Sequence, residues 1–400
     1  MNILSINQAD LVGGAAELAY NLNTELRSRG HQVDMFVCDK SSQDPSVQII
    51  PRPKSLFYLS HLLGTDINLF NTDYILETKE FKQADIIHCH NLHGHYFNLR
   101  TLGKMAKLKP VVWTLHDMWA LTPYCSHSSS QSDERGFYSC AANSSKSWCK
   151  RHNWRSLRKH KEEIYQELNL DLVTPSLWLQ AKLESSVLMD KKHHLIHNGI
   201  NLSARPDRRN SSALRQKLGL PSDKKIVLFV ASGGKDNIWK GWTYAEQVIT
   251  AYQDRSDTIF VCIGGTKSGA NNLSNLLFVD YLADKQILSE YYACADAFLL
   301  SSTAESFALV VLEAMFAGLP VVSFAVGAVP ELINHQVNGY IANYLDCADL
   351  LAGIDFALAL DQSALNNILL NNQSLISQHF SLTTMTDQYL ELYQQIVKSH

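Results

Sequence analysis

The stretch DAFLLSSTAESFALVVLEAMFAGLPVVSFAV (296–326) contains a complete strand–helix–strand unit. DAFLLSS is an apolar strand, and the short loop 303–305 leads into a predicted helix over 306–317. Gly318 ends the helix because glycine tolerates the left-handed backbone found after helix ends, and Pro320 opens the next strand. A strand, a crossover helix and a second strand in this order predict a parallel sheet.

The same alternation runs through the rest of the chain. In the first half, the predicted strands are NILSI, QVDMFVC, ADIIHCH, PVVWTLH, LDLVTPS and HHLIHNGI. The second half adds KKIVLFVAS, DTIFVCIGG and NLLFVDY. Residues 202–222 are rich in Arg, Ser, Asp and Pro, a composition typical of a linker. These patterns predict an α/β protein with two Rossmann-like domains that face each other across a cleft.

The predicted domains are residues 1–202 and residues 203–380. A final amphipathic helix over 381–400 is expected to pack back on the first domain. Ligands of such sheets bind at the carboxyl ends of the strands. The polar residues that follow strands are therefore the candidates for a functional site.

The composition indicates an ordinary globular protein. Of the 400 residues, 46% are apolar and 18% are charged, and the net charge of −4 gives no general attraction to nucleic acid. We find no signal peptide and no window close to the ~18 apolar residues of a membrane span. Eight cysteines without CxxC spacing predict free thiols and a cytoplasmic protein.

The loop before the predicted helix is a candidate anion site. Glu305 stands at the helix entrance, just before Ser306. In the first turn, the backbone N–H groups of Phe307, Ala308 and Leu309 would have no partner within the helix. Such free N–H groups bind anions, and a diphosphate is one that they suit.

Glu313 lies seven residues after Ser306, on the same predicted face and about two turns (~10 Å) deeper. A carboxylate there could accept hydrogen bonds from both hydroxyls of a ribose, while Glu305 would meet the group that the phosphates carry. Two alternatives exist. Glu305 could cap the helix while Glu313 pairs with a cation, or the two glutamates could be a glycosidase pair.

The motif ESFALVVLEAMFAGLPVV, followed by GAVPELINHQVNGYIA, resembles the E-x7-E signature of retaining GT-B glycosyltransferases of family four. The resemblance extends over nearly the whole chain. It implies that Glu313 holds the donor ribose and that Glu305 lies beside the donor sugar.

The segment WKGW (239–242) follows the strand KKIVLFVAS. Its Lys240 and Gly241 match a family pattern in which an Arg and, five residues on, a Lys-Gly pair face the donor diphosphate. At the arginine position the chain has Lys235, which supplies charge without a bidentate fork. The alternative is that both lysines are solvated.

The glycine turn LVGGAAELA (11–19) lies between the first strand and the first helix. It resembles the family loop that faces the phosphates and the acceptor, which makes Gly13 and Gly14 candidate donor contacts. NAD binding is an alternative because Asp34 lies near the position of a ribose-binding acid, but the chain lacks GxGxxG.

The segment WTLHDMWALTPYC (113–125) places His116 and Asp117 after a strand. HDMW resembles a motif of bacterial capsule and exopolysaccharide transferases, and the family resemblance implies that His116 contacts the donor sugar. The four histidines of IHCHNLHGHY (87–96) could bind zinc or line the acceptor side. By resemblance, Asn198 is a hinge residue.

Two further segments carry more than one interpretation. Cys125, Cys140 and Cys149 resemble a remnant of a cysteine pattern in the relatives. The basic segment KSWCKRHNWRSLRKHK (146–161) is either a solvated helix or a contact with an anionic membrane surface.

Together these features predict a retaining glycosyltransferase. The donor is expected to be a nucleotide-sugar, UDP- or GDP-linked, and the acceptor a saccharide or lipid-linked saccharide in surface polysaccharide synthesis. The chain contains no Asp-x-Asp, so no metal is expected; Lys240, Lys235 and the helix start would stabilise the leaving diphosphate. The alternatives are a non-catalytic nucleotide-sugar-binding subunit and a GT-B sugar-nucleotide epimerase.

Overall fold

The computed structural model describes residues 1–128, 130–140, 154–203, 211–230, 237–264 and 273–400. The chain divides into two compact units. The first unit contains Met1–Asn198 and Leu382–His400, and the second contains Gly199–Ser381. In the described ranges, no helix combines the length and the apolar character needed to cross a membrane.

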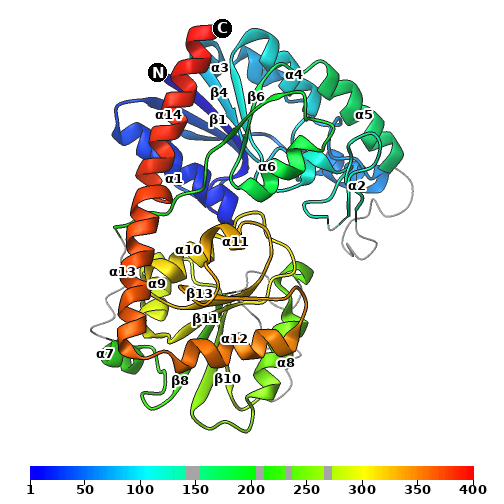
Figure 1. The fold of residues 1–400 in the computed structure, drawn as a ribbon. Helices are drawn as coiled ribbons and strands as arrows, with labels where there is room; N and C mark the ends of the chain where they lie inside the picture. Colours follow the sequence, from blue (N-terminus) through cyan, green and yellow to red (C-terminus); the bar gives the residue numbers. More distant parts are fainter. Residues whose placement is uncertain (129, 141–153, 204–210, 231–236, 265–272) are drawn as a thin grey trace. The chain divides into compact units, whose positions relative to one another are not determined.

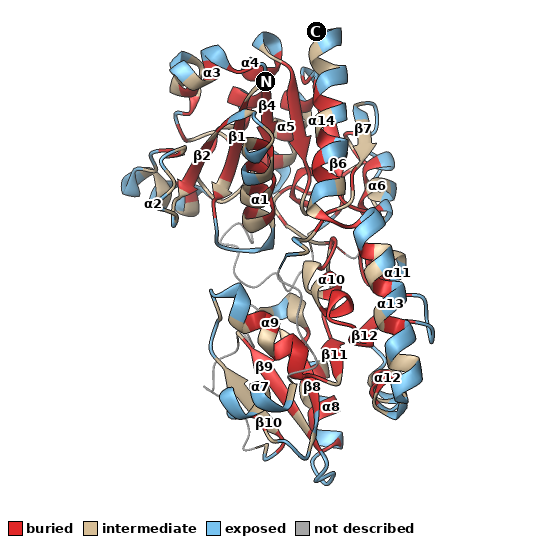
Figure 2. Ribbon diagram, turned by 90° about the vertical axis from the view of Figure 1, so that its left-hand side faces the viewer, coloured by how far each residue is buried: buried red, intermediate tan, exposed pale blue. Residues whose placement is uncertain are grey.

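The first unit is built on a seven-stranded sheet in which all neighbouring strands are parallel, in the order β3-β2-β1-β4-β5-β6-β7 (Figure 1). Its strands are β1 (Asn2–Ala9), β2 (Gln32–Asp39), β3 (Val47–Ile49), β4 (Ile86–Cys89), β5 (Val111–Thr114), β6 (Asp171–Thr174) and β7 (Lys192–Leu195). Its helices include α1 (Gly14–Ser28), α2 (Lys54–Leu63), α3 (Lys79–Gln83), α4 (Leu99–Leu108), α5 (Trp154–Gln166), α6 (Leu177–Glu184) and α14 (Leu382–Ser399). Every residue of β4, β5 and β6 is buried, as expected for strands covered on both faces (Figure 2).

Helix α14 completes the first unit although it comes last in the chain. It lies against α1, where Arg29 forms an ion pair with Asp387 (Figure 1). Tyr389 and Tyr393 of α14 are buried, and the Tyr393 hydroxyl hydrogen-bonds to Nδ1 of His88 on β4 at 2.6 Å. The last helix is therefore part of the core that supports β4.

The second unit contains a six-stranded parallel sheet in the order β10-β9-β8-β11-β12-β13. Its strands are β8 (Lys225–Val230), β9 (Thr258–Ile263), β10 (Leu276–Val279), β11 (Ala297–Leu300), β12 (Val321–Phe324) and β13 (Gly339–Ala342). Its helices include α7 (Ser211–Lys217), α8 (Trp242–Ala251), α9 (Lys285–Cys294), α10 (Leu309–Phe316), α11 (Val329–Leu332), α12 (Cys347–Ala359) and α13 (Gln362–His379).

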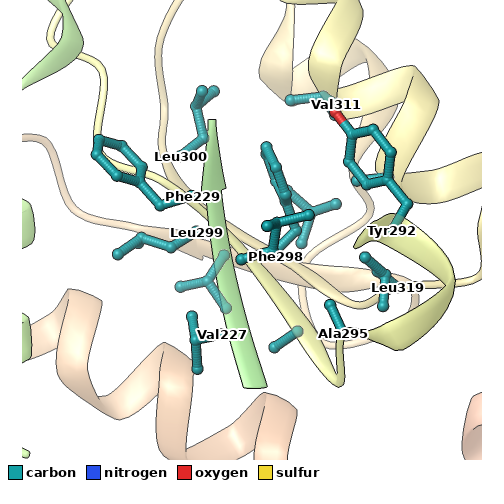
Figure 3. Close-up of a cluster of buried hydrophobic side chains, with 14 of the residues drawn as sticks. Val227, Phe229, Tyr292, Ala295, Phe298, Leu299, Leu300, Val311 and Leu319 are labelled. Carbon is teal, nitrogen blue, oxygen red and sulfur yellow. The ribbon is translucent and has the colours of Figure 1, made fainter. Parts of the chain in front are cut away.

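The core of the second unit explains why the segment 296–326 is so apolar. Phe229 of β8 and Leu299 of β11 lie on one side of β8, while Phe298 of β11 and Val311 of α10 lie on the other side (Figure 3). All four residues are at most 2% exposed. The two central strands thus bury apolar side chains on both faces of the sheet, and the crossover helix packs on one of these faces.

The predicted start of the crossover helix at Ser306 is wrong. The helix α10 begins at Leu309, because Ala308 before it has a left-handed backbone with φ of 66°. Ser306 and Phe307 are buried in the loop that leads to it. This loop is therefore longer than the sequence pattern indicates.

The prediction that all cysteines are free thiols is also wrong. Cys125 and Cys140 form a disulfide, with their Cα atoms 5.6 Å apart. The chain around the two cysteines folds back on itself, since Tyr138 N–H donates to the Leu121 carbonyl at 3.0 Å. Cys149, the third cysteine of the predicted remnant, lies outside the described residues.

Candidate functional site

In the second unit, the turn before α8 is tied to the loop after β11. The Thr303 N–H donates to the Trp239 carbonyl at 2.9 Å, and the Ser301 hydroxyl donates to the Lys240 carbonyl at 3.0 Å. Gly241 has φ of 62°, and a Cβ at this position would overlap the Ser301 carbonyl oxygen. Glycine at position 241 is thus required for the close approach of the two loops.

Lys240 and Glu305 are in direct contact. Nζ of Lys240 donates to Oε1 of Glu305 at 2.7 Å, and the Ser302 hydroxyl donates to the same oxygen at 2.8 Å. The two charged side chains are only 21% and 13% exposed. The structure therefore brings together two predicted site residues that are 65 positions apart in the sequence.

Glu305 does not cap the helix, so the capping alternative is wrong. Helix α10 has Ala308 as its N-cap and no side-chain cap bond. Among the described residues, the N–H groups of Leu309 and Val310 have no hydrogen-bond partner, whereas that of Val311 donates to the Ala308 carbonyl at 2.9 Å. Of the predicted anion-binding N–H groups, only that of Leu309 belongs to the first turn.

Glu313 lies one turn, and not two, from the start of α10. Its carboxylate accepts a hydrogen bond from the Tyr292 hydroxyl at 2.9 Å, and Nζ of Lys285 is 3.9 Å from its second oxygen. Burial and the Glu313 charge raise the pKa of Tyr292 well above its ordinary value. The Glu313 side chain is still 25% exposed, so it combines a fixed position with access to a ligand.

Sequence reasoning missed two residues that support this loop. Gly327 has φ of 53°, and a Cβ there would overlap the Glu305 carbonyl oxygen. The Tyr344 hydroxyl donates to the Thr303 carbonyl at 3.0 Å. The quoted motif GAVPEL contained the glycine signal, while nothing in the sequence indicates Tyr344. Lys235 lies outside the described residues.

In the first unit, the glycine turn stands at the carboxyl end of β1. Gly13 is the N-cap of α1 with φ of 97°, and a Cβ there would meet nothing within 4 Å, so the backbone is open to a ligand. Gly14 is the first residue of the helix. Asp34 lies inside β2 and not at its carboxyl end, which disfavours the NAD alternative.

The HDMW segment begins directly after β5 and contacts the loop after β4. His116 Nε2 and His90 Nδ1 are 3.0 Å apart, and His93 Nε2 is 3.0 Å from Oδ2 of Asp117. Oδ1 of Asp117 accepts a hydrogen bond from the Trp119 N–H at 2.8 Å. These residues line one small pocket.

The four histidines of the 88–95 motif do not form one metal site. His88 and His90 lie on and directly after β4, His93 is bound to Asp117, and His95 is 2.8 Å from the Ser60 hydroxyl. Over the ranges that the structure describes, no three His, Cys, Asp or Glu side chains are grouped to hold a metal ion. The zinc alternative has no support among these residues.

Lys161 is a buried residue that the sequence pattern did not distinguish from its basic neighbours. Its side chain is 0% exposed, and Nζ donates to the carbonyls of Trp119 and Thr122 at 2.6 and 2.9 Å. Nζ also lies 3.7 Å from the centre of the Trp119 ring, and burial lowers the Lys161 pKa to about 7. Within the basic segment, Lys161 is therefore a core residue; residues 146–153 lie outside the described part of the chain.

Two family models match the chain. "Glycosyltransferase Family 4" matches residues 12–204, and "Glycosyl transferases group 1" matches residues 224–359, so that together they account for most of both units. The chain belongs to the family 4 glycosyltransferases. Its two parallel α/β units and its structural neighbours confirm the predicted GT-B fold.

This family 4 glycosyltransferase is similar to named proteins along most of its length. It is 23% identical to the colanic acid biosynthesis glycosyl transferase WcaC of Escherichia coli, over 83% of this chain and 85% of that protein. Sucrose-phosphate synthase of Thermosynechococcus elongatus superposes with a TM-score of 0.73 at 19% identity, covering 100% of this chain and 99% of the other. Anabaena HepE, solved in complex with UDP, gives a TM-score of 0.69 at 19% identity and covers 99% of this chain and 100% of its own.

Proposed function

We propose that this glycosyltransferase moves a sugar from a nucleotide-sugar donor to a saccharide or lipid-linked saccharide, with retention of configuration, in surface polysaccharide synthesis. The contact between Lys240 and Glu305, next to the first turn of α10, is the observation that carries the proposal. It puts a cation and two free N–H groups, those of Leu309 and Val310, in one short loop region. Such a region suits a diphosphate.

In this proposal, Lys240 and the first turn of α10 bind the donor diphosphate. Glu313 accepts hydrogen bonds from the ribose hydroxyls, with Tyr292 fixing its carboxylate. Glu305 faces the donor sugar and orients Lys240 until the diphosphate arrives. The pair is mostly buried, so an unpaired Lys240 would be costly. When the diphosphate binds, Lys240 exchanges Glu305 for a phosphate oxygen as its ionic partner and is never left unpaired.

His116, Gly13 and Gly14 of the first unit are proposed ligand contacts, as the family resemblance implies. A UDP- or GDP-linked donor fits the proposal, and HepE has been solved in one complex with UDP and in another with UDP-glucose. WcaC, named for colanic acid biosynthesis, supports a polysaccharide product.

The chemistry needs no protein base. As the bond between the sugar and the diphosphate breaks, negative charge grows on the leaving oxygen, and Lys240 stabilises it. The acceptor hydroxyl attacks from the leaving-group face and gives its proton to the departing phosphate. The new bond therefore has the configuration of the old one.

A thermal-shift panel of UDP-, GDP-, ADP- and TDP-sugars tests donor binding. A true donor at about 100 times its Kd is expected to stabilise the protein by ~2.7 kcal/mol. The donor so identified is then incubated with saccharide and lipid-linked acceptors, and NMR of the product gives the anomeric configuration. An inverted product would contradict retention.

The same assay separates the two alternatives. Binding without turnover of any acceptor would indicate a nucleotide-sugar-binding subunit. Conversion of the donor with no acceptor present would indicate an epimerase.

A further inference from the structure

The contact between His90 and His116 restricts where each ring carries its proton. Their facing atoms, His90 Nδ1 and His116 Nε2, are 3.0 Å apart, and the rings are nearly parallel, with an interplanar angle of 19°. Burial lowers the pKa of His90 well below its ordinary value and that of His116 to about 4. Both rings are therefore neutral at pH 7, so one facing nitrogen donates and the other accepts.

The second nitrogen of His90 decides between these two arrangements. His90 is 1% exposed, and its Nε2 is buried with no hydrogen-bond partner among the described residues. The adjacent His88 cannot supply one, since its ring nitrogens already contact Tyr393 at 2.6 Å and Thr114 at 2.8 Å. A buried N–H without a partner is rarer in proteins than a buried acceptor without one. The His90 proton therefore belongs on Nδ1, from which it is donated to Nε2 of His116.

This arrangement leaves the single proton of neutral His116 on Nδ1. The backbone of His90 is held on both sides, because its carbonyl accepts from Nε1 of Trp113 at 2.8 Å and its N–H donates to the Ile6 carbonyl at 2.9 Å. His90 thus has little freedom to change its hydrogen bond. His116 lines the small pocket described above, and its Nδ1 has no hydrogen-bond partner in the described ranges.

We propose that His90 is a positioning residue that fixes His116 in the Nδ1–H tautomer, so that His116 donates a hydrogen bond to a ligand oxygen and does not act as a base. The assignment of that oxygen to a sugar substrate rests on the proposed function. The free side chain of histidine prefers the Nε2–H tautomer, so the expected state is the opposite of the default.

The tautomer is measured directly in the full-length chain labelled with ¹⁵N-histidine. Long-range ¹H–¹⁵N spectra show which ring nitrogen carries the proton, and the signals lost in His116→Gln identify His116. We expect Nδ1–H for both His116 and His90. An Nε2–H signal for His116 in the unsubstituted chain would overturn the proposal.

Two substitutions at His90 separate positioning from packing. His90→Phe removes the donor, and His116 is expected to change to Nε2–H with about a tenfold loss in kcat/KM, the value of one neutral hydrogen bond. His90→Asn retains an N–H donor and is expected to retain both the tautomer and most of the activity. His193→Phe on β7 is the matched control and leaves the His116 signals unchanged.

The readout does not depend on turnover. If no nucleotide-sugar is used but His116 carries its proton on Nδ1, the proposed function fails and the tautomer assignment stands. If a nucleotide-sugar is turned over but His116 carries its proton on Nε2, the tautomer assignment fails and the proposed function stands. If His90→Phe does not fold, the signal of the unsubstituted chain decides alone.

Discussion

At the scale of single residues, the pair of Lys240 and Glu305 combines a structural role with a proposed catalytic one. Each side chain is mostly buried, and each is the charged partner of the other. Removal of Lys240 or Glu305 alone leaves the other charge unpaired and poorly solvated, which destabilises the fold. Removal of both charges leaves no such unpaired charge. Stability and turnover therefore respond differently to single and double substitutions.

Lys240→Ala is expected to reduce turnover by on the order of a hundredfold, by analogy with the loss of one oxyanion-hole donor. It should also lower the free energy of unfolding by ~1–3 kcal/mol, since Glu305 loses its cation. In the double variant with Glu305→Gln, stability should recover while turnover stays low. Urea unfolding and initial rates give the two quantities, and Lys217→Ala, which removes the ion pair with Glu290 in the same unit, is the control. Recovery of turnover in the double variant would contradict the catalytic role.

Glu313→Ala is expected to weaken binding of the nucleoside diphosphate. The variant loses hydrogen bonds from two ribose hydroxyls to a charged acceptor, each worth ~1.5–3 kcal/mol. Tyr292→Phe should have a smaller effect of the same sign, because it leaves the carboxylate but removes its 2.9 Å hydrogen bond. Titration calorimetry measures both. Equal affinity in Glu313→Ala and the parent would refute the ribose assignment.

At the scale of secondary structure elements, the approach of two loops depends on glycine. Gly241→Ala places a methyl group against the Ser301 carbonyl oxygen and also imposes φ of 62° on a residue with a side chain. Gly219→Ala is the matched control in the same unit, because Gly219 has φ of 66° but open space around it. The control should show only the backbone strain, about 1–3 kcal/mol. Gly241→Ala should lose more stability and most turnover; equal losses in the two variants would show that the loop contact is unimportant.

His88, within β4, and His116, after β5, are buried histidines from which we expect the folded state to lose stability in acid. Burial lowers the pKa of His88 to about 3 and that of His116 to about 4, below the ordinary 6.5. Between pH 6.5 and 4 the unfolded chain binds protons that the folded chain does not, so stability rises with pH in this window and is lost as pH falls. Each histidine contributes a slope of up to ~1.4 kcal/mol per pH unit.

Urea unfolding of the parent and of His88→Gln from pH 7 to pH 4.5 measures this slope. The variant should lose stability less steeply with acid, whatever its stability at pH 7. Parallel slopes would indicate that His88 is protonated in the folded state.

The elements that could be predicted from sequence are those whose local pattern agrees with their packing. The central strands are mostly apolar and were identified, as were the edge strands β7 and β10, whereas the edge strands β3 and β13, with three and four residues, were not. The start of α10 was misplaced because Ala308 has a left-handed backbone, a conformation that the sequence indicates only where the residue is glycine. Glu305 and Glu313 were predicted from their positions on the expected helix, and Lys240 from the family resemblance. The disulfide and the burial of Lys161 depend on how a loop folds back, which the sequence pattern does not show.

At the scale of the whole molecule, we expect the proposed enzyme to work without a metal ion. Turnover is expected to survive exhaustive chelation, because Lys240 and the first turn of α10 supply the positive charge at the leaving diphosphate. Initial rates before and after chelator treatment test this, with Lys240→Ala as the variant whose residual rate should be equally insensitive. Activity that disappears with chelator and returns with manganese or magnesium would contradict the metal-free proposal.

The membership of α14 in the first unit has a consequence for biosynthesis. A ribosome makes Met1–Asn198 before Gly199–Ser381, but the helix that packs on α1 and bonds to His88 emerges only after all of Gly199–Ser381. The second unit can thus complete its fold on the nascent chain at a stage when His88 of β4, in the first unit, still lacks its contact with Tyr393 of α14. The first unit is therefore synthesised first but completed only after the second. A chain that is truncated before α14 would contain all of the second unit but would lack the last helix of the first.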